Sequence, residues 1–333
     1  MIPVYSTWLA AHGKLWYDDK WYRLAWIVSP QALAILVVLW FWAMPSSGRN
    51  AQWAKPVDPA TRASQLVALR DAAKTNRTAM DTLERDARGG ETVAEFLYGT
   101  LFDPELKMST IVQPDASKAM DWYGKAAAQG NEAALNNLAL FYYRGTYTRV
   151  DVTRACFYAR KLSNNAFHTG LQVKGDCYAS GLGGTPADMT QAANAYEASA
   201  AKGDLRAEAA LGYFYENGIG GKDRNSEIAL KHYRNAADKG DPLGLHNLGY
   251  AYNSGVLGLQ RDGAEAARLI ARALELKFDV TLQSLTTHSE LWSADFWQNL
   301  QRRLEEKGLY TGVIDGRPNP ATIDAVRRLG SRT

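Results

Sequence analysis

Residues 203–240 read GDLRAEAALGYFYENGIGGKDRNSEIALKHYRNAADKG, and this stretch contains the pattern that organises the chain. Small and aromatic residues recur at helical spacing on both sides of the glycine-rich run 218–221. This spacing predicts two helices joined by a tight loop. Gly218 ends the first run, as expected of a residue that must adopt a left-handed conformation at a helix end. The stretch therefore predicts one helix–loop–helix unit.

The same unit recurs along the chain at an almost constant period. Units open at Gly130, Ala166, Gly203, Gly240 and Lys277, which are 36, 37, 37 and 37 residues apart. A period of this length is typical of a helical solenoid, because a single helix pair cannot bury its apolar faces without its neighbours. We therefore expect an all-α fold with repeats over residues 89–277. The residues expected to cap the second helices are Asp151, Asp188, Asn225 and Asp262.

These residues resemble the Sel1-like repeat, a relative of the tetratricopeptide repeat. Its signature Leu-Gly-x-x-Tyr-x-x-Gly is clearest in Leu211–Gly218 and Leu248–Gly255. The third unit departs most, with Gly-Asp-Cys-Tyr at 175–178 where the others have a hydrophobic helix. The resemblance implies a scaffold that binds other proteins. It brings no catalytic residues, so we do not expect an enzyme.

Composition and residue spacing argue against several other classes of protein. The formal net charge is only +3, which makes no electrostatic case for nucleic acid. The two cysteines and five histidines show no metal-ligand spacing, so we expect neither a metal nor another cofactor. His232 and His246 lie on successive units and could face each other, but no nucleophile accompanies them.

The N-terminal part predicts a membrane anchor. A short tail (1–23) precedes residues 24–44, which carry no charge over 21 positions and are long enough to cross a bilayer. A signal peptide or a buried core helix are the alternatives, although the run is long for a signal peptide. The three basic residues close to each side of it leave the orientation open. A linker at 45–57 and capping helices at 58–88 should then lead into the repeats.

Cys156 and Cys177 occupy positions that hold apolar residues in sister units, so both should be buried. Because the second helix of one unit packs on the first helix of the next, the two could be close enough for a disulfide in an oxidising compartment. Two small buried hydrophobic residues without a bond are the simpler interpretation.

After residue 277 the repeat ends, and we expect a polar linker at 278–290. Residues 291–333 resemble the small helical peptidoglycan-binding domain found at the ends of many cell-wall proteins. The match is carried by Leu300-Gln301, Leu304, Gly308, Gly312, Asp315-Gly316, Pro320, Thr322 and Ala325-Val326. Asn319 stands where the family usually has glycine, and a domain that keeps the fold but has lost glycan affinity is the alternative. The resemblance makes Tyr310, Asp315, Arg317 and Asn319 the candidate ligand-binding residues, with Asp315 expected chiefly to hold the turn.

The sequence thus predicts a bacterial inner-membrane protein with a single membrane span and most of its chain in the periplasm. It would bind envelope proteins through its repeats and peptidoglycan through its C-terminus. An accessory regulator of a wall-remodelling or secretion enzyme is the alternative. A third reading is a hub that faces the cytoplasm, in which case the C-terminal resemblance would be fortuitous.

Overall fold

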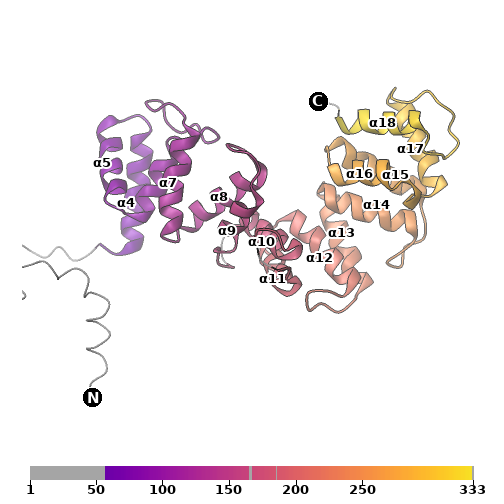
Figure 1. Ribbon diagram of the computed structural model, residues 1–333, viewed down its shortest axis with the longest axis horizontal. Helices are drawn as coiled ribbons and strands as arrows, with labels where there is room; N and C mark the ends of the chain where they lie inside the picture. Colours follow the sequence, from indigo (N-terminus) through magenta and orange to yellow (C-terminus); the bar gives the residue numbers. More distant parts are fainter. Residues whose placement is uncertain (1–56, 165–166, 185, 332–333) are drawn as a thin grey trace, which may run out of the picture. The chain divides into compact units, whose positions relative to one another are not determined.

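The computed structural model describes residues 57–164, 167–184 and 186–331, and this part of the chain contains only helices, turns and loops (Figure 1). The chain divides into two units, residues 1–62 and 63–333, and every helix after the first described one lies in the second. The helices are α4 (Pro59–Ala73), α5 (Arg77–Arg88), α6 (Thr92–Thr100), α7 (Ala116–Ala128), α8 (Glu132–Arg144), α9 (Val152–Ala159), α10 (His168–Ser180), α11 (Met189–Ala200), α12 (Leu205–Asn217), α13 (Ser226–Asp238), α14 (Pro242–Ser254), α15 (Gly263–Glu275), α16 (Asp279–Thr287), α17 (Ala294–Glu306) and α18 (Pro320–Ser331), with a short 3₁₀ turn η2 (Ser289–Leu291).

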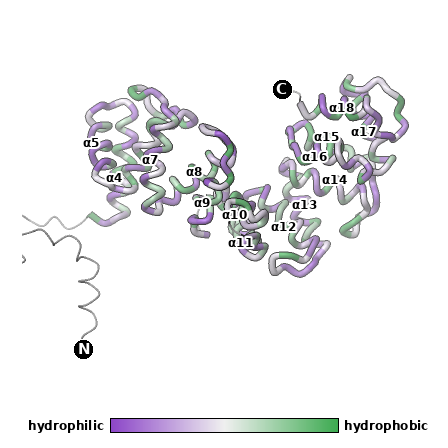
Figure 2. Tube along the Cα trace, in the orientation of Figure 1, coloured by the Kyte–Doolittle hydropathy of each residue, from purple (hydrophilic) through white to green (hydrophobic). Residues whose placement is uncertain are grey.

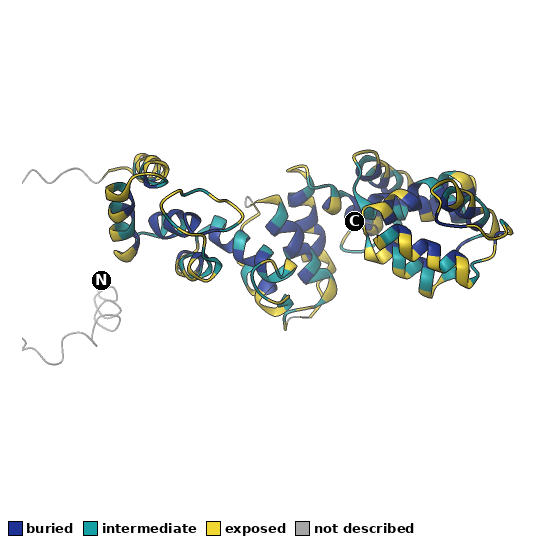
Figure 3. Ribbon diagram, turned by 90° about the horizontal axis from the view of Figure 1, so that it is seen from above, coloured by how far each residue is buried: buried dark blue, intermediate teal, exposed yellow. Residues whose placement is uncertain are grey.

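Helices α6 to α15 form successive pairs, from α6–α7 to α14–α15, and each pair packs on the next. Within a pair the two helices contact each other, and the second helix also contacts the first helix of the following pair, as α11 contacts α12. First helices also touch across neighbouring pairs, as α12 touches α14. Figure 3 shows buried residues along the helix faces that meet one another, with exposed residues on the outer sides of the helices and on the loops. The expected solenoid of helix pairs is confirmed.

Local chemistry sets the ends of these helices. Each residue expected to cap a second helix does so; the Asp188 carboxylate, for example, accepts a hydrogen bond from the Gln191 N–H at 2.9 Å. Three of the first helices, α8, α12 and α14, are capped in the same way; Asp204, for example, accepts from the Ala207 N–H at 2.8 Å. Glycine in the left-handed conformation ends the first helices of the last four pairs. These residues are Gly145, Gly181, Gly218 and Gly255.

A glycine on the first helix and a large side chain on the second let the helices of a pair approach closely. A Cβ added to Gly212 would lie 2.5 Å from the Tyr233 ring, and one added to Gly175 would also overlap the ring of Tyr196. The second pair has Ala139 and Ala159 at the equivalent positions, both fully buried. The two positions therefore change together, glycine with a large side chain and alanine with alanine, because the space between the helices is shared.

The N-terminal helices α4 and α5 lie where capping helices were predicted. Leu66 of α4 and Leu83 of α5 are fully buried in one core with Ala94 of α6. The opposite face of α5 carries charged side chains such as Arg77, which pairs with Asp81 at 3.1 Å. A polar outer face is what the end of a repeat stack requires.

The C-terminal segment differs from the predicted linker and separate domain. Residues 279–287 form helix α16, and α17 packs directly on α15 of the last repeat pair. Ile270 of that pair shares one core with Leu285, Trp297 and Val326. Residues 291–331 therefore close the end of the repeat stack, without a linker between them.

Polar contacts hold α16, which falls within the predicted linker, and the segment that leads into α17. Thr281 is fully buried, and its hydroxyl oxygen is hydrogen-bonded to Nδ1 of His246 at 3.0 Å. Asn253 of α14 donates to the Leu291 carbonyl at 3.0 Å and accepts from the Ser293 N–H at 2.9 Å. A segment that looks polar in sequence is thus held in place by partners more than 30 residues away.

The predicted membrane span at 24–44, together with the tail at 1–23 and the linker up to residue 56, lies outside the described residues. Among the described helices, none combines the length and the apolar character needed to cross a membrane. Figure 2 accordingly shows hydrophobic and hydrophilic residues interspersed along the helices.

Candidate functional site

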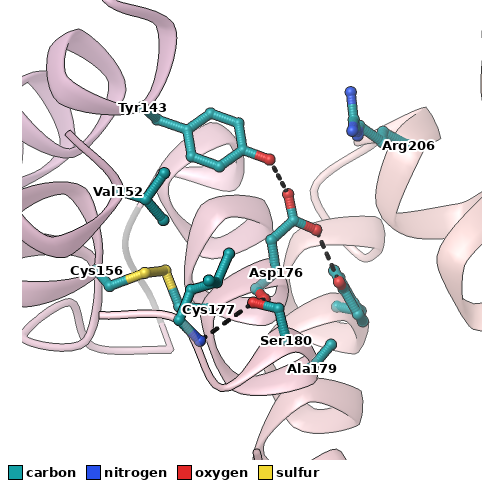
Figure 4. A pocket seen from close by; sticks show the side chains of 10 residues that line it. Tyr143, Val152, Cys156, Asp176, Cys177, Ala179, Ser180 and Arg206 are labelled. Atoms are coloured by element: carbon teal, nitrogen blue, oxygen red, sulfur yellow. Dashed lines mark hydrogen bonds between the residues drawn. A yellow bond between two sulfur atoms is a disulfide. The ribbon is translucent and has the colours of Figure 1, made fainter. Parts of the chain in front are cut away.

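An open cleft with a volume of 640 Å³ lies where three successive repeat pairs meet (Figure 4). Its walls come from both helices of the second and third pairs and from the start of α12 in the fourth. The lining residues are Tyr143, Val152, Cys156, Asp176, Cys177, Ala179, Ser180, Leu182, Tyr196 and Arg206. The cleft combines an apolar wall with one carboxylate and one guanidinium group.

The carboxylate of Asp176 is held in place by hydroxyl groups from two repeat pairs. Tyr143 of α8 donates to Oδ2 at 2.6 Å (Figure 4), and Tyr196 of α11 donates to Oδ1 at 2.7 Å. The amide of Gln172, one turn earlier in α10, also donates to Oδ2. Donors from both sides therefore fix the position of the carboxylate in the cleft.

Burial shifts the pKa of each group in this cluster. It raises the pKa of the Asp176 carboxyl, and the hydrogen bonds from Tyr143 and Tyr196 oppose that rise. Burial, followed by the negative charge of Asp176, raises the pKa of Tyr143 to about 12 and raises that of Tyr196 as well. Both hydroxyl groups therefore keep their protons at neutral pH and act as donors.

Cys156 and Cys177 form a disulfide beside this cluster, with their Cα atoms 5.6 Å apart. The bond joins α9 of one repeat pair to α10 of the next, and both residues are buried. The simpler interpretation of two unbonded buried cysteines is not what the structure contains.

The third pair departs from its sister pairs in where it holds the acid. Tyr123 donates to Asp103 at 2.9 Å and Tyr233 donates to Glu216 at 2.7 Å, and both acids lie four residues after the glycine of their first helix. In the third pair that position is Ala179, and the acid is Asp176, next to Gly175. The unusual Gly-Asp-Cys-Tyr segment at 175–178, which departs from the repeat, is therefore the sequence signal for this cleft.

The C-terminal candidates do not form an exposed groove. Tyr310 is only 3% exposed, and its hydroxyl donates to the Val313 carbonyl at 2.8 Å. Its ring therefore cannot lie against a ligand, and the role proposed for Tyr310 from the sequence is wrong. The buried amide of Gln301 explains this arrangement, because it donates to the Arg317 carbonyl at 2.9 Å and accepts from the Gly316 N–H at 2.9 Å.

The other three candidates lie around the same turn. Asp315 accepts a hydrogen bond from the Arg317 N–H at 2.9 Å, which is the turn-holding role expected of it. Asn319 accepts from the Thr322 N–H at 2.9 Å at the start of α18, where it acts as a helix cap. The side chain of Arg317 is exposed. Of the four, Arg317 alone presents a side chain without a described structural task.

The histidines on successive units do not meet. His232 Nδ1 lies 2.5 Å from Glu208, whereas His246 bonds to Thr281. Within residues 57–164, 167–184 and 186–331, no three His, Cys, Asp or Glu side chains are grouped to hold a metal ion.

Comparisons with known proteins agree with this architecture. The Sel1 repeat model matches residues 94–131, 132–167, 175–204, 205–241 and 242–278, and no curated protein matches the chain. The crystal structure of a Sel1 repeat protein from Oxalobacter formigenes is similar, with a TM-score of 0.54 and 24% identity over 81% of this chain and 98% of that one. A protective antigen from uropathogenic Escherichia coli, c5321, which displays an SLR fold, has a TM-score of 0.49 and 22% identity over 82% of this chain and 61% of its own. Because the repeat model covers more than half of the residues, this chain belongs to the Sel1 repeat family.

Proposed function

We propose that this chain is a membrane-tethered periplasmic scaffold that holds partner proteins on its repeats. One observation carries the binding role: Tyr213 of α12 and Tyr250 of α14 occupy equivalent positions, 37 residues apart, and are 52% and 37% exposed. The two helices contact each other, so the rings lie on adjacent first helices. Tyrosine is enriched at protein interfaces because it combines a large apolar ring with a polar tip.

Site-directed cross-linking in cells tests the binding role. A photo-reactive residue at position 217, one turn beyond Tyr213, should cross-link to specific proteins. Tyr213→Ala with Tyr250→Ala should reduce the yield of those adducts by about tenfold, the loss expected when interface aromatic residues are truncated. Phe157→Ala is the matched control, because Phe157 is 51% exposed on the second helix α9. Equal yields from the double variant and the wild type would contradict the proposal that Tyr213 and Tyr250 bind the partner.

The periplasmic location is supported by two features. Residues 24–44 carry no charge, and the Cys156–Cys177 disulfide is of a kind that persists in oxidising compartments such as the periplasm. A reporter that is active only in the periplasm, fused after Thr333, should be active in this arrangement. Activity of a cytoplasm-only reporter at that position would contradict it.

Peptidoglycan contact remains a part of the proposal and rests on the resemblance of residues 291–333. With Tyr310 buried, contact would have to come from the exposed loop that holds Val313 and Arg317. Arg317→Ala should then lower co-sedimentation with purified sacculi, while Asp324→Ala, which changes an exposed charge on α18, should not. A wild-type protein that stays in the supernatant would leave the scaffold without a wall contact.

If partners gain or lose enzymatic activity on binding, the chain is an accessory regulator instead.

A further inference from the structure

We infer that the cleft at Asp176 receives a lysine or arginine side chain of the partner protein. This inference rests on the proposed scaffold function and names the chemistry of one contact. It uses three observations: the charge around the cleft, the free acceptor position on the carboxylate, and the apolar wall that leads to it.

Negative charge outweighs positive charge around the cleft. Burial is the main cause that raises the carboxyl pKa of Asp176 and of Asp241, and the nearby charge of Asp204 adds to the rise in both. Arg206 opposes them, and His168 pairs with Asp204 at 2.9 Å. Among these groups, three carboxylates stand against two cations even with His168 protonated; only Asp176 and Arg206 line the cleft itself. The excess favours a cationic group from a partner and disfavours a carboxylate or phosphate group.

Asp176 still has capacity for one more donor. An ionised carboxylate offers about four acceptor positions, two on each oxygen. Tyr143 and Gln172 use those of Oδ2, whereas Oδ1 accepts only from Tyr196 among the described residues. An ammonium or guanidinium group can therefore donate to Oδ1 without displacing an existing bond. Because the tyrosines already hold the carboxylate, binding requires little rearrangement.

The wall beside Asp176 suits the aliphatic part of a lysine or arginine side chain. Val152, Ala179 and Leu182 line it together with the disulfide, and Leu182 is 51% exposed. Long basic side chains commonly place their methylene groups along apolar surface while the charged head reaches a polar partner. The volume of 640 Å³ is ample for one such side chain.

Replacing Arg206 tests the inference through a gain in affinity, which misfolding would not produce. Its side chain is exposed on α12 and makes no hydrogen bond or ion pair with a described residue, so replacing it should leave the fold intact. If the cleft takes a cation, removing this competing charge should improve binding. If the cleft takes an anion, the same change should weaken it.

The experiment selects peptides from a displayed random library on the immobilised full-length protein. Peptides that bind should share one position enriched in lysine or arginine. A selected peptide is then compared with versions carrying norleucine or glutamate there. Asp176→Asn should weaken the lysine peptide by about tenfold, as for loss of a charge-assisted hydrogen bond, and abolish its advantage over norleucine. Arg206→Gln should strengthen it by about threefold.

Glu216→Gln is the matched control, because it alters the same kind of tyrosine–carboxylate bond in the fourth pair, outside the cleft lining. It should leave peptide affinity unchanged, and its melting temperature shows how much stability such a bond contributes. Enrichment of acidic residues, weaker binding by Arg206→Gln, or failure to select any peptide would each overturn the inference. None of these results would alter the cross-linking test at Tyr213 and Tyr250, so the cleft and the scaffold function can fail separately.

Discussion

At the scale of single residues, the fold depends on how glycine and tyrosine share space between two helices. Position 212 requires glycine because the Tyr233 ring occupies the volume that a Cβ would need. Gly124, in the middle of α7, meets no atom within 4 Å at the same hypothetical Cβ. Two glycines in helices therefore have opposite effects on stability.

Gly212→Ala should destabilise the protein by about 1–3 kcal/mol, because the new methyl group forces apart a packed pair of helices. Gly124→Ala should stabilise it by up to about 1 kcal/mol, because alanine has less conformational freedom to lose on folding. Chemical denaturation of both variants measures the two free energies of unfolding. A shift of the same sign in both would contradict this account of the packing.

His246 makes stability depend on pH. Burial lowers the pKa of its imidazole from 6.5 to about 4, so the folded protein holds this side chain neutral. The unfolded chain binds the proton more readily, and the stability contributed above pH 6.5 is lost as the pH falls towards 4. The full loss is about 3 kcal/mol for this one group.

The free energy of unfolding should therefore fall more between pH 7.5 and pH 4.5 for the wild type than for His246→Gln. Taking the difference between the two proteins removes the contributions of other groups, including Asp176 and Asp241, whose raised carboxyl pKa values act in the opposite direction. Parallel pH profiles would show that His246 is not titrating as a buried group.

At the scale of helices, the disulfide reinforces a core made of small side chains. Ala139, Ala155 and Ala159 fill the space around Cys156 and Cys177, where the first, third and fourth pairs bury a tyrosine. Small side chains bury less apolar area, so this junction gains less from packing than its neighbours do. A covalent bond between α9 and α10 offsets that difference.

Replacing both cysteines with alanine should lower stability by about 3 kcal/mol, the loop-closure contribution for a separation of 21 residues. Thermal unfolding of the wild type with and without a reducing agent should show a loss of similar size, and the double variant should not respond to the reductant. A wild-type protein indifferent to reduction would mean that the bond contributes nothing to the native state.

Helix pairs could be predicted from the sequence because their signals are local. A cap such as Asp188 and a terminal glycine such as Gly218 act within a few residues of their own position. The burial of the Tyr310 side chain could not be predicted in this way, because it depends on Gln301 and on the turn that follows Tyr310. Helix α16 was missed for the same reason, because the groups that satisfy Thr281 and Ser284 come from His246 and Trp292.

At the scale of the whole molecule, the C-terminal helices belong to the repeat stack. Trp297 of α17 is 1% exposed and lies in the same core as Ile270 of α15. Lys307 also pairs with Glu275 at 2.7 Å. Residues 291–333 and the last repeat pair should therefore unfold together.

Deleting residues 291–333 should lower the melting temperature of the remaining chain and expose α15 to proteolysis, because a large apolar face loses its cover. Trp297→Ala in the full chain should also lower the melting temperature, though by less than the deletion does. Its free energy of unfolding should fall by about 3–5 kcal/mol. If the shortened chain melts like the wild type, residues 291–333 are an independent domain after all.

Asn253 has a consequence for how such a protein can evolve. The first and fourth pairs place Asp103 and Glu216 at this position to hold a tyrosine of their own pair, whereas Asn253 holds the backbone of Leu291 and Ser293. A duplicated internal pair would find partners on both sides, so insertions can lengthen the middle of the protein. A second copy of the last pair would leave one such asparagine without its backbone partners. The number of repeats can therefore grow from within, while the final pair is inherited together with its cap.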